Sequence, residues 1–144
     1  MPDTIFQTIH ASCVSFEGNA VLIKGASGSG KSSLALQIMA FGAQLVSDDR
    51  TELRRIDNSI WAAPPKTISG LIEARGLGIL SAEHTPSAQI VCVVDMDVVA
   101  TERLPDPQVT PCLGLPLPCL HKIDTQAFPA IVLQYLKGGI QRDI

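Results

Sequence analysis

The sequence predicts a single α/β domain with a mixed β-sheet. Three observations lead to this class: a β-hairpin pattern near the start, a strand, loop, helix, strand order directly after it, and further strand-like runs later in the chain. A length of 144 residues corresponds to one domain of ordinary size, so we take residues 1–144 as one unit. Hydrophobic residues make up 46% and aromatic residues 4%, which predicts a largely aliphatic core.

The composition also excludes several classes of function. Lysine and arginine total 11 against 14 acidic residues, a formal charge of −3, which argues against nucleic-acid binding. No apolar run approaches the ~20 residues that span a bilayer, and the start lacks a secretion-signal pattern. We therefore expect a cytoplasmic protein that binds no membrane. The four cysteines contain no C-x-x-C pair, which favours buried free thiols over a zinc site.

The first two predicted strands form a hairpin. Apolar and β-branched residues alternate roughly over residues 8–16, and a turn at residues 17–19 leads into a strand over residues 20–24. A turn at this position makes paired residue numbers sum to about 36–38, which places His10 opposite residues 26–28.

A predicted crossover follows the hairpin. Glycine-rich residues 25–30 lead into a helix over residues 31–41, which Gly42 ends, and a short apolar strand follows at residues 44–47. The order strand, helix, strand predicts a βαβ unit with a parallel strand pair. The apolar residues on one face of this helix are Leu34, Ile38 and Phe41.

The middle of the chain predicts more strands. Residues 50–60 alternate enough for one or two strands, and the glycine-bearing residues 71–79 predict a loop. Residues 88–94 are the most strand-like run, and we expect that strand to end at residues 95–97, which puts two carboxylates, those of Asp95 and Asp97, at a strand end.

The last third predicts extended segments and one helix. Five of the ten prolines lie between Pro105 and Pro118, which excludes a helix there and favours extended edge segments. A helix is predicted over residues 128–137, with Pro129 in its first turn.

A phosphate-binding motif lies between the second strand and the first helix. Residues 25–32 read GASGSGKS and satisfy G-x-x-x-x-G-K-[ST], the P-loop pattern. Backbone N–H groups of such a loop converge on phosphate oxygens, Lys31 reaches the β and γ phosphates, and the Ser32 hydroxyl suits Mg²⁺. The predicted nucleotide-binding residues are Gly25, Ala26, Ser27, Gly28, Ser29, Gly30, Lys31, Ser32 and Ser33.

Two acidic residues follow the strand at residues 44–47. A parallel crossover brings the carboxyl ends of its strands to one edge of the sheet, so Asp48 and Asp49 should lie beside the loop. One acid can bind Mg²⁺ while the other accepts a proton from an attacking hydroxyl. A solvated turn is the alternative, and Asp95, after a strand like a Walker B strand, competes for the metal role.

His10, Glu73 and Arg75 are weaker candidates. The hairpin geometry brings His10 near the loop, where it could contact phosphate or modulate the base, or be an ordinary strand residue. Glu73 and Arg75 could be a metal-side carboxylate and a phosphate-binding cation, or a surface ion pair. The residue pattern leaves both pairs of alternatives open.

In combination, these residues resemble the catalytic domain of HPr kinase/phosphorylase, a bacterial family that phosphorylates a serine of the phosphocarrier protein HPr. His10 precedes the nucleotide loop as in that family, and residues 45–49 match its acidic segment. Residues 71–79, LIEARGLGI, resemble its E-x-R-G-x-G motif, which is the most discriminating of these features.

The resemblance implies a fold similar to the nucleotide domain of phosphoenolpyruvate carboxykinase. It further implies a serine kinase that uses ATP and Mg²⁺, acts on an HPr-like phosphocarrier and forms a homo-oligomer. Asp48 would be the base and His10 would assist near the phosphates, with Lys31 and Arg75 completing the catalytic set. The residues implied on the metal side are Ser32, Asp49 and Glu73.

The chain departs from longer members of that family. The catalytic motifs begin at once, which resembles the short proteobacterial form without an N-terminal domain. After Gly78, residues 80–85 lead quickly into the next strand, where longer members carry an arginine-containing loop linked to dephosphorylation; this argues against phosphorylase activity. Two alternatives stay open: a nucleotide-sensing partner of the phosphotransferase system, and a small-molecule P-loop kinase.

Overall fold

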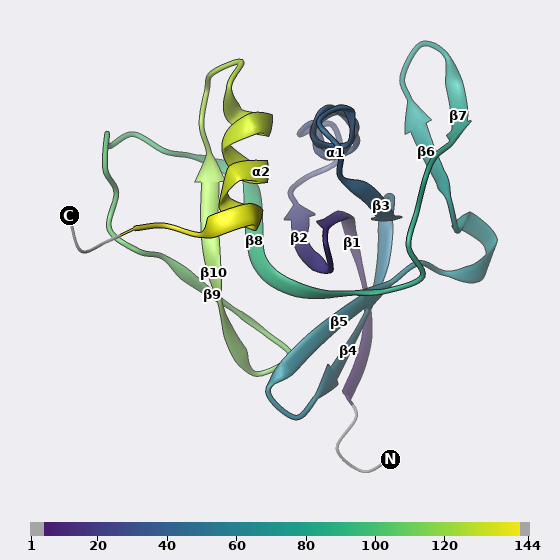
Figure 1. Cartoon of the computed structure of the whole chain (residues 1–144), viewed down its shortest axis with the longest axis horizontal. Coiled ribbons are helices and arrows are strands. Elements are labelled where there is room, and N and C mark those ends of the chain that lie inside the picture. The colour runs from purple at the N-terminus through teal and green to yellow at the C-terminus, as the bar shows by residue number, and fades with distance from the viewer. Residues whose placement is uncertain (1–4, 142–144) are drawn as a thin grey trace.

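The computed structural model describes residues 5–141, which contain ten strands, two α-helices and one short 3-10 helix (Figure 1). The elements are, in chain order, β1 (Ile5–Phe16), β2 (Asn19–Lys24), α1 (Lys31–Ala40), β3 (Gln44–Ser47), β4 (Arg50–Ile56), β5 (Ser59–Ala63), η1 (Lys66–Ile68), β6 (Leu71–Ala74), β7 (Gly78–Ser81), β8 (Ala88–Val99), β9 (Val109–Cys112), β10 (Leu115–Lys122) and α2 (Phe128–Gly138).

Eight of the strands form one mixed sheet, as the sequence predicts. Their order is β2-β1-β4-β5-β8-β10-β9, with β3 beside β1, and β2 pairs again with β8, so five strands form a closed circuit of pairings. The β2–β8 and β8–β10 pairs are parallel and the others are antiparallel. Figure 1 shows α1 and α2 next to each other above the strands, with the β6–β7 hairpin projecting beyond α1.

The predicted parallel neighbours β2 and β3 are not neighbours. β1 lies between them and is antiparallel to both, because Cys13, Val14 and Ser15 pair with β2 on one side and with β3 on the other. The local hairpin takes one edge of β2 and β8 takes the other, so β3 joins the free edge of β1. β2 and β3 nevertheless run in the same direction, and their carboxyl ends meet at one edge.

The predicted register of the first hairpin is also wrong. Glu17 and Gly18 both have positive φ, 51° and 86°, which is the geometry of a tight two-residue hairpin turn. The turn is therefore shorter than expected, and the β1–β2 pairs begin at Ala11 with Lys24. His10 lies beyond that hairpin and pairs with Arg50 on β4 instead.

Two further strand predictions need correction. Residues 71–79 belong to a hairpin of β6 and β7 rather than a loop, because Gly76, with φ 93°, allows the tight turn that pairs Ala74 with Gly78. β8 does not end at Asp95 but continues to Val99, where it pairs with Lys122 of β10 after a register shift. Backbone pairing with neighbouring strands thus overrides the low strand preference of aspartate.

The other element predictions are confirmed. Residues 50–60 contain β4 and the start of β5, the proline-rich region contains the extended strands β9 and β10 with β9 at the sheet edge, and α2 carries Pro129 in its first turn. Within residues 5–141, neither helix has the length and apolar character needed to cross a membrane.

The core is aliphatic, as the composition predicts, and consists of two clusters. One cluster packs the helices on the sheet and includes Leu34 and Ile38; the other lies among β1, β4, β5 and β8. Phe41 does not join Leu34 and Ile38, because it lies at the end of α1 and is 57% exposed.

The cysteines are free, and burial raises the pKa of the Cys13 and Cys92 thiols, that of Cys92 to about 12.

Candidate active site

The glycine-rich loop connects the end of β2 to the start of α1, which is the placement that the P-loop pattern requires. Gly25 and Gly30 have φ values of 154° and 99°, in the region that favours glycine. A Cβ added to Gly25 would lie 2.6 Å from Ser29 Oγ and 2.9 Å from Met96 Cβ. The loop therefore has no space for a side chain at its first position.

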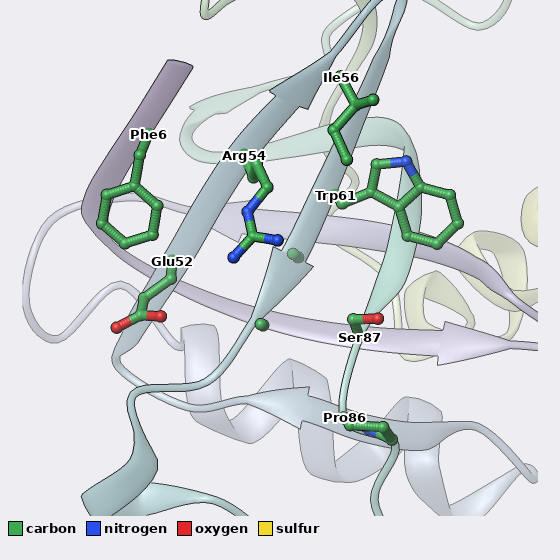
Figure 2. A pocket seen from close by; sticks show the side chains of 9 residues that line it. Phe6, Glu52, Arg54, Ile56, Trp61, Pro86 and Ser87 are labelled. Atoms are coloured by element: carbon green, nitrogen blue, oxygen red, sulfur yellow. The ribbon is translucent and has the colours of Figure 1, made fainter. Parts of the chain in front are cut away.

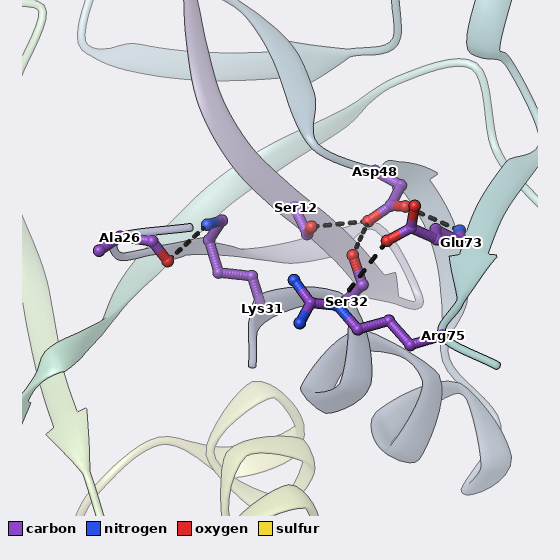
Figure 3. A network of polar contacts seen from close by, with 7 residues as sticks. All are labelled: Ser12, Ala26, Lys31, Ser32, Asp48, Glu73 and Arg75. Carbon is purple, nitrogen blue, oxygen red and sulfur yellow. Dashed lines mark hydrogen bonds and ion pairs between the residues drawn. The ribbon is translucent and has the colours of Figure 1, made fainter. Parts of the chain in front are cut away.

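The Lys31 side chain folds back over this loop. Its Nζ donates hydrogen bonds to the carbonyl oxygens of Gly25 (2.8 Å) and Ala26 (3.1 Å), and Figure 3 shows the second contact. An ammonium group held only by carbonyl oxygens can exchange them for phosphate oxygens without breaking an ion pair. The lysine is thus positioned next to the loop that would hold a phosphate.

Asp48 lies at the centre of the polar network in Figure 3. Its Oδ1 accepts hydrogen bonds from Ser12 Oγ (2.8 Å) and Ser32 Oγ (2.6 Å), and its Oδ2 accepts one from the Glu73 backbone N–H (2.9 Å). The residue is only 6% exposed. One carboxylate therefore links β1, the start of α1, the end of β3 and β6, which are far apart in the sequence.

Asp49 and His10 border the same cleft from neighbouring segments. Asp49 is exposed and has a φ of 68°, and its backbone is held by hydrogen bonds to Ala11 and Ser12. His10 is exposed on β1 beside Arg50, so it reaches the cleft through the β1–β4 pairing and not through the predicted hairpin register.

Glu73 and Arg75 form an exposed ion pair on the β6–β7 hairpin. Arg75 Nε lies 3.9 Å from Glu73 Oε1. The side chain of Arg75 is 73% exposed and that of Glu73 is 56% exposed. Such a pair contributes little to stability because water screens both charges. Both side chains are free to turn toward a ligand in the cleft.

A cleft of about 1090 Å³ collects nearly all the predicted site residues. They are His10, Gly25, Ala26, Ser27, Gly28, Gly30, Lys31, Ser32, Ser33, Asp48, Asp49, Glu73 and Arg75. Ser29 does not line it, because its side chain packs against Gly25. Asp95, the competing metal candidate, is also not among the lining residues.

Two features of this region were not predicted from the sequence. Four apolar residues, Ile68, Leu71, Ile72 and Ile79, also line the cleft, and recognising residues 71–79 as a hairpin would have indicated the last three. The sequence predicted Asp97 as a carboxylate at a strand end but not its contact with the loop: both of its carboxylate oxygens accept a hydrogen bond from the Ala26 N–H, at 2.9 and 3.0 Å. The residues that follow β2 and the residues that follow Asp95 are far apart in the sequence, so no local pattern indicated this contact.

The oxygen groups of the site fit Mg²⁺. This ion binds proteins through one or two carboxylates and keeps water or substrate phosphates as its other ligands. The hydroxyl of Ser32 touches the carboxylate of Asp48, and Asp49 is the next residue. Within residues 5–141, no group of three or more histidine, cysteine or acidic side chains is arranged to hold a metal alone.

A second, smaller hollow of about 400 Å³ lies on the outer surface of β1, β4 and β5. Figure 2 shows the Arg54 side chain between the rings of Phe6 and Trp61, with Glu52 at one side. Phe6, Arg54 and Trp61 are cross-strand neighbours, since Phe6 pairs with Arg54 and Arg54 pairs with Trp61. The hollow shares no lining residue with the cleft.

The fold and the cleft define a class of protein: an α/β domain whose P-loop sequence opens a helix beside an acidic strand end. Comparison with known proteins makes this class specific. The chain belongs to the HPr serine kinase C-terminal domain family, whose model matches residues 4–98. This range covers well over half of the chain and contains every predicted site residue.

A solved structure shows the same fold. The HPr(Ser) kinase/phosphatase from Coxiella burnetii superposes with a TM-score of 0.76 at 23% sequence identity, covering 91% of this chain and 94% of that chain. Because it covers 91% of the chain, this match extends beyond the range that the family model covers. The predicted mixed α/β architecture is therefore confirmed.

Proposed function

We propose that this chain is a serine kinase that uses ATP and Mg²⁺ to phosphorylate an HPr-like phosphocarrier protein. The observation that carries the proposal is the 2.6 Å hydrogen bond from Ser32 to Asp48, which joins the loop motif to the acidic strand end. Family membership supports the same reaction. The proposal treats residues 1–144 as one catalytic domain and places it in the cytoplasm.

The loop and its lysine would bind the nucleotide. The triphosphate would accept hydrogen bonds from the loop N–H groups and from the first turn of α1, whose dipole favours negative charge. Lys31 would leave the carbonyl oxygens of Gly25 and Ala26 for the β and γ phosphates. A cleft of about 1090 Å³ leaves space for a segment of a protein substrate as well as a nucleotide.

Bound Mg²⁺ would neutralise charge on the β and γ phosphates, and Ser32, Asp49 and Glu73 are the residues that we expect to hold it. The Ser32 hydroxyl oxygen can bind Mg²⁺ while its proton still points toward Asp48, because the lone pairs of that oxygen remain free. Glu73 would leave its weak ion pair, which frees Arg75 to contact phosphate oxygens. His10 would contact the phosphates from the β1 side.

Asp48 would act as the base. Its Oδ2 accepts one hydrogen bond, from Glu73 N–H, so a lone pair remains for the hydroxyl of the substrate serine. As Asp48 takes the proton, the serine oxygen forms a bond to the γ phosphorus, and the bond from that phosphorus to the β–γ bridging oxygen breaks. The products are phosphoserine and ADP, and the contacts to Ser12 and Ser32 keep the carboxylate in position.

The test is transfer of label from γ-labelled ATP, in the presence of Mg²⁺, to HPr and to an HPr variant whose target serine is alanine. We expect label only on the HPr that has the serine, and we expect Asp48→Asn to abolish transfer while ATP still binds. Asp57→Asn is the matched control, because Asp57 is an exposed acid with a φ of 54°, outside the cleft.

Other outcomes would contradict the kinase proposal. ATP binding with no transfer to any acceptor would support the nucleotide-sensing alternative, and label on a small metabolite would support a small-molecule kinase. The reverse reaction is followed separately, as release of label from phosphorylated HPr in inorganic phosphate; we expect none.

A further inference from the structure

We infer that Asp97 is a positioning residue that holds the first turn of the nucleotide loop in its binding shape. This inference rests on the nucleotide binding proposed above. Its basis is the hydrogen bond from the Ala26 N–H to both carboxylate oxygens of Asp97, at 2.9 and 3.0 Å. A hydrogen bond from an amide to a carboxylate is stronger than one to a neutral acceptor.

The extension of β8 brings Asp97 to the loop. β2 and β8 pair in parallel up to Lys24 and Asp95, so the next residues of β8 run beside the start of the loop. Met96 packs against Gly25 so closely that no Cβ fits between them. Asp95 Oδ1 accepts a hydrogen bond from the Asp97 backbone N–H (2.9 Å), which orients the residue.

The peptide groups of Ala26 are held from two directions. Asp97 binds its N–H, while its carbonyl oxygen accepts hydrogen bonds from Lys31 Nζ (3.1 Å, Figure 3) and from Ser29 N–H (3.0 Å). When Lys31 turns to a phosphate, Ala26 loses one of these contacts. Asp97 is then the side chain that keeps this residue in place, so its contribution matters most in the nucleotide-bound state.

A second effect of Asp97 has the opposite sign. Its negative charge lies near the loop and would repel a bound triphosphate, although the residue is exposed and water and salt screen that repulsion. If positioning dominates, removing the carboxylate weakens ATP binding; if repulsion dominates, removing it strengthens binding. The sign of the change therefore decides between the two roles.

The experiment compares Asp97→Ala and Asp97→Asn with the wild-type chain and with Glu102→Gln. Glu102 is an exposed acid in the segment after β8, and its variant changes the net charge equally. We expect Asp97→Ala to raise the Kd for Mg-ATP and the KM for ATP about five- to tenfold, with kcat within about twofold, because one charge-assisted hydrogen bond is lost. Asp97→Asn keeps an acceptor oxygen, so its Kd should change less than about threefold, and Glu102→Gln should match the wild type.

Amide hydrogen exchange supplies an independent readout without nucleotide. Exchange at Ala26 should accelerate in Asp97→Ala and less in Asp97→Asn, while exchange in the core strands stays unchanged. Unchanged or tighter ATP binding by Asp97→Ala, or unchanged exchange at Ala26, would overturn the inference. If Asp97→Ala does not fold, Asp97→Asn becomes the test. Wild-type ATP affinity of Asp97→Asn, together with wild-type exchange at Ala26, would then refute the inference. A wild-type chain that binds no ATP would instead overturn the proposed function.

Discussion

Asp48 provides a prediction about stability that is separate from catalysis. Replacing it with alanine removes the acceptor for three donors: Ser12 Oγ, Ser32 Oγ and the Glu73 N–H. These donors differ in their access to water, because Ser12 is fully buried whereas Ser32 and Glu73 border the cleft. The loss should therefore come mainly from Ser12.

The magnitude follows from these contacts. A buried donor left without a partner costs about 1–3 kcal/mol, and two donors that water can reach cost less than about 1 kcal/mol each, so Asp48→Ala should lower the free energy of unfolding by about 3 kcal/mol. In Asp48→Asn, the amide oxygen can accept from Glu73 N–H while the amide nitrogen donates to the serine hydroxyls. The loss should then be about 1 kcal/mol, through the weaker neutral hydrogen bonds.

Urea unfolding followed by circular dichroism measures these differences. With a slope of about 2 kcal/mol per molar urea, Asp48→Ala should lower the midpoint by about 1.5 M and Asp48→Asn by about 0.5 M. A double-mutant cycle with Ser12→Ala should give a coupling of about 1–2 kcal/mol, larger than the coupling with Ser32→Ala. Equal losses in the two Asp48 variants, or a larger coupling to Ser32 than to Ser12, would show that the buried Ser12 donor is not the main contribution.

Two further predictions concern the core and its thiols. Ile38→Ala on α1 should destabilise the protein by about 2–5 kcal/mol, because Ile38 is fully buried. Phe41→Ala at the end of α1 should cost less than about 1 kcal/mol, because Phe41 is exposed. Thermal unfolding that ranks the two variants in the reverse order would be inconsistent with this orientation of the helix. Burial raises the pKa of Cys13 and Cys92, so these thiols keep their protons in the folded state, whereas unfolded thiols lose theirs above about pH 8.5. As the pH rises above that value, the free energy of unfolding should therefore fall by about 1.4 kcal/mol per pH unit for each thiol. Urea midpoints between about pH 8 and pH 10.5 should decline less steeply in Cys92→Ala than in the wild type, and equal slopes would contradict this prediction.

Local patterns in the sequence predicted most of the elements correctly. The loop of residues 25–30, the helix after it and the closing helix are determined by glycine and proline positions and by helical spacing, which act over a few residues. Asp48 was placed beside the loop through the common direction of β2 and β3. That direction holds although β1 separates the two strands, because β1 is antiparallel to both.

Two errors are local, since the turn at Glu17 and Gly18 is shorter than expected and residues 71–79 form a hairpin, and the other strand errors concern contacts between segments that are distant along the chain. His10 pairs with Arg50, β8 continues to Val99, where it pairs with β10, and β3 lies beside β1. Strand pairing is set by the packing and hydrogen bonding of the whole sheet, and no residue in one strand specifies which strand lies beside it.

Local sequence patterns specify the chemical groups of this protein: a glycine-rich loop suited to phosphate oxygens, a lysine and a serine at the start of a helix, and two adjacent acids at the end of a strand. Which of these groups touch depends on the folded arrangement of the whole chain. The three donors around the Asp48 carboxylate, and the Asp97 carboxylate on the Ala26 N–H, come from segments 16 to 71 residues away. Such contacts form only when the closed sheet brings those segments together, because hydrogen bonds act over about 3 Å while sequence patterns describe neighbours along the chain.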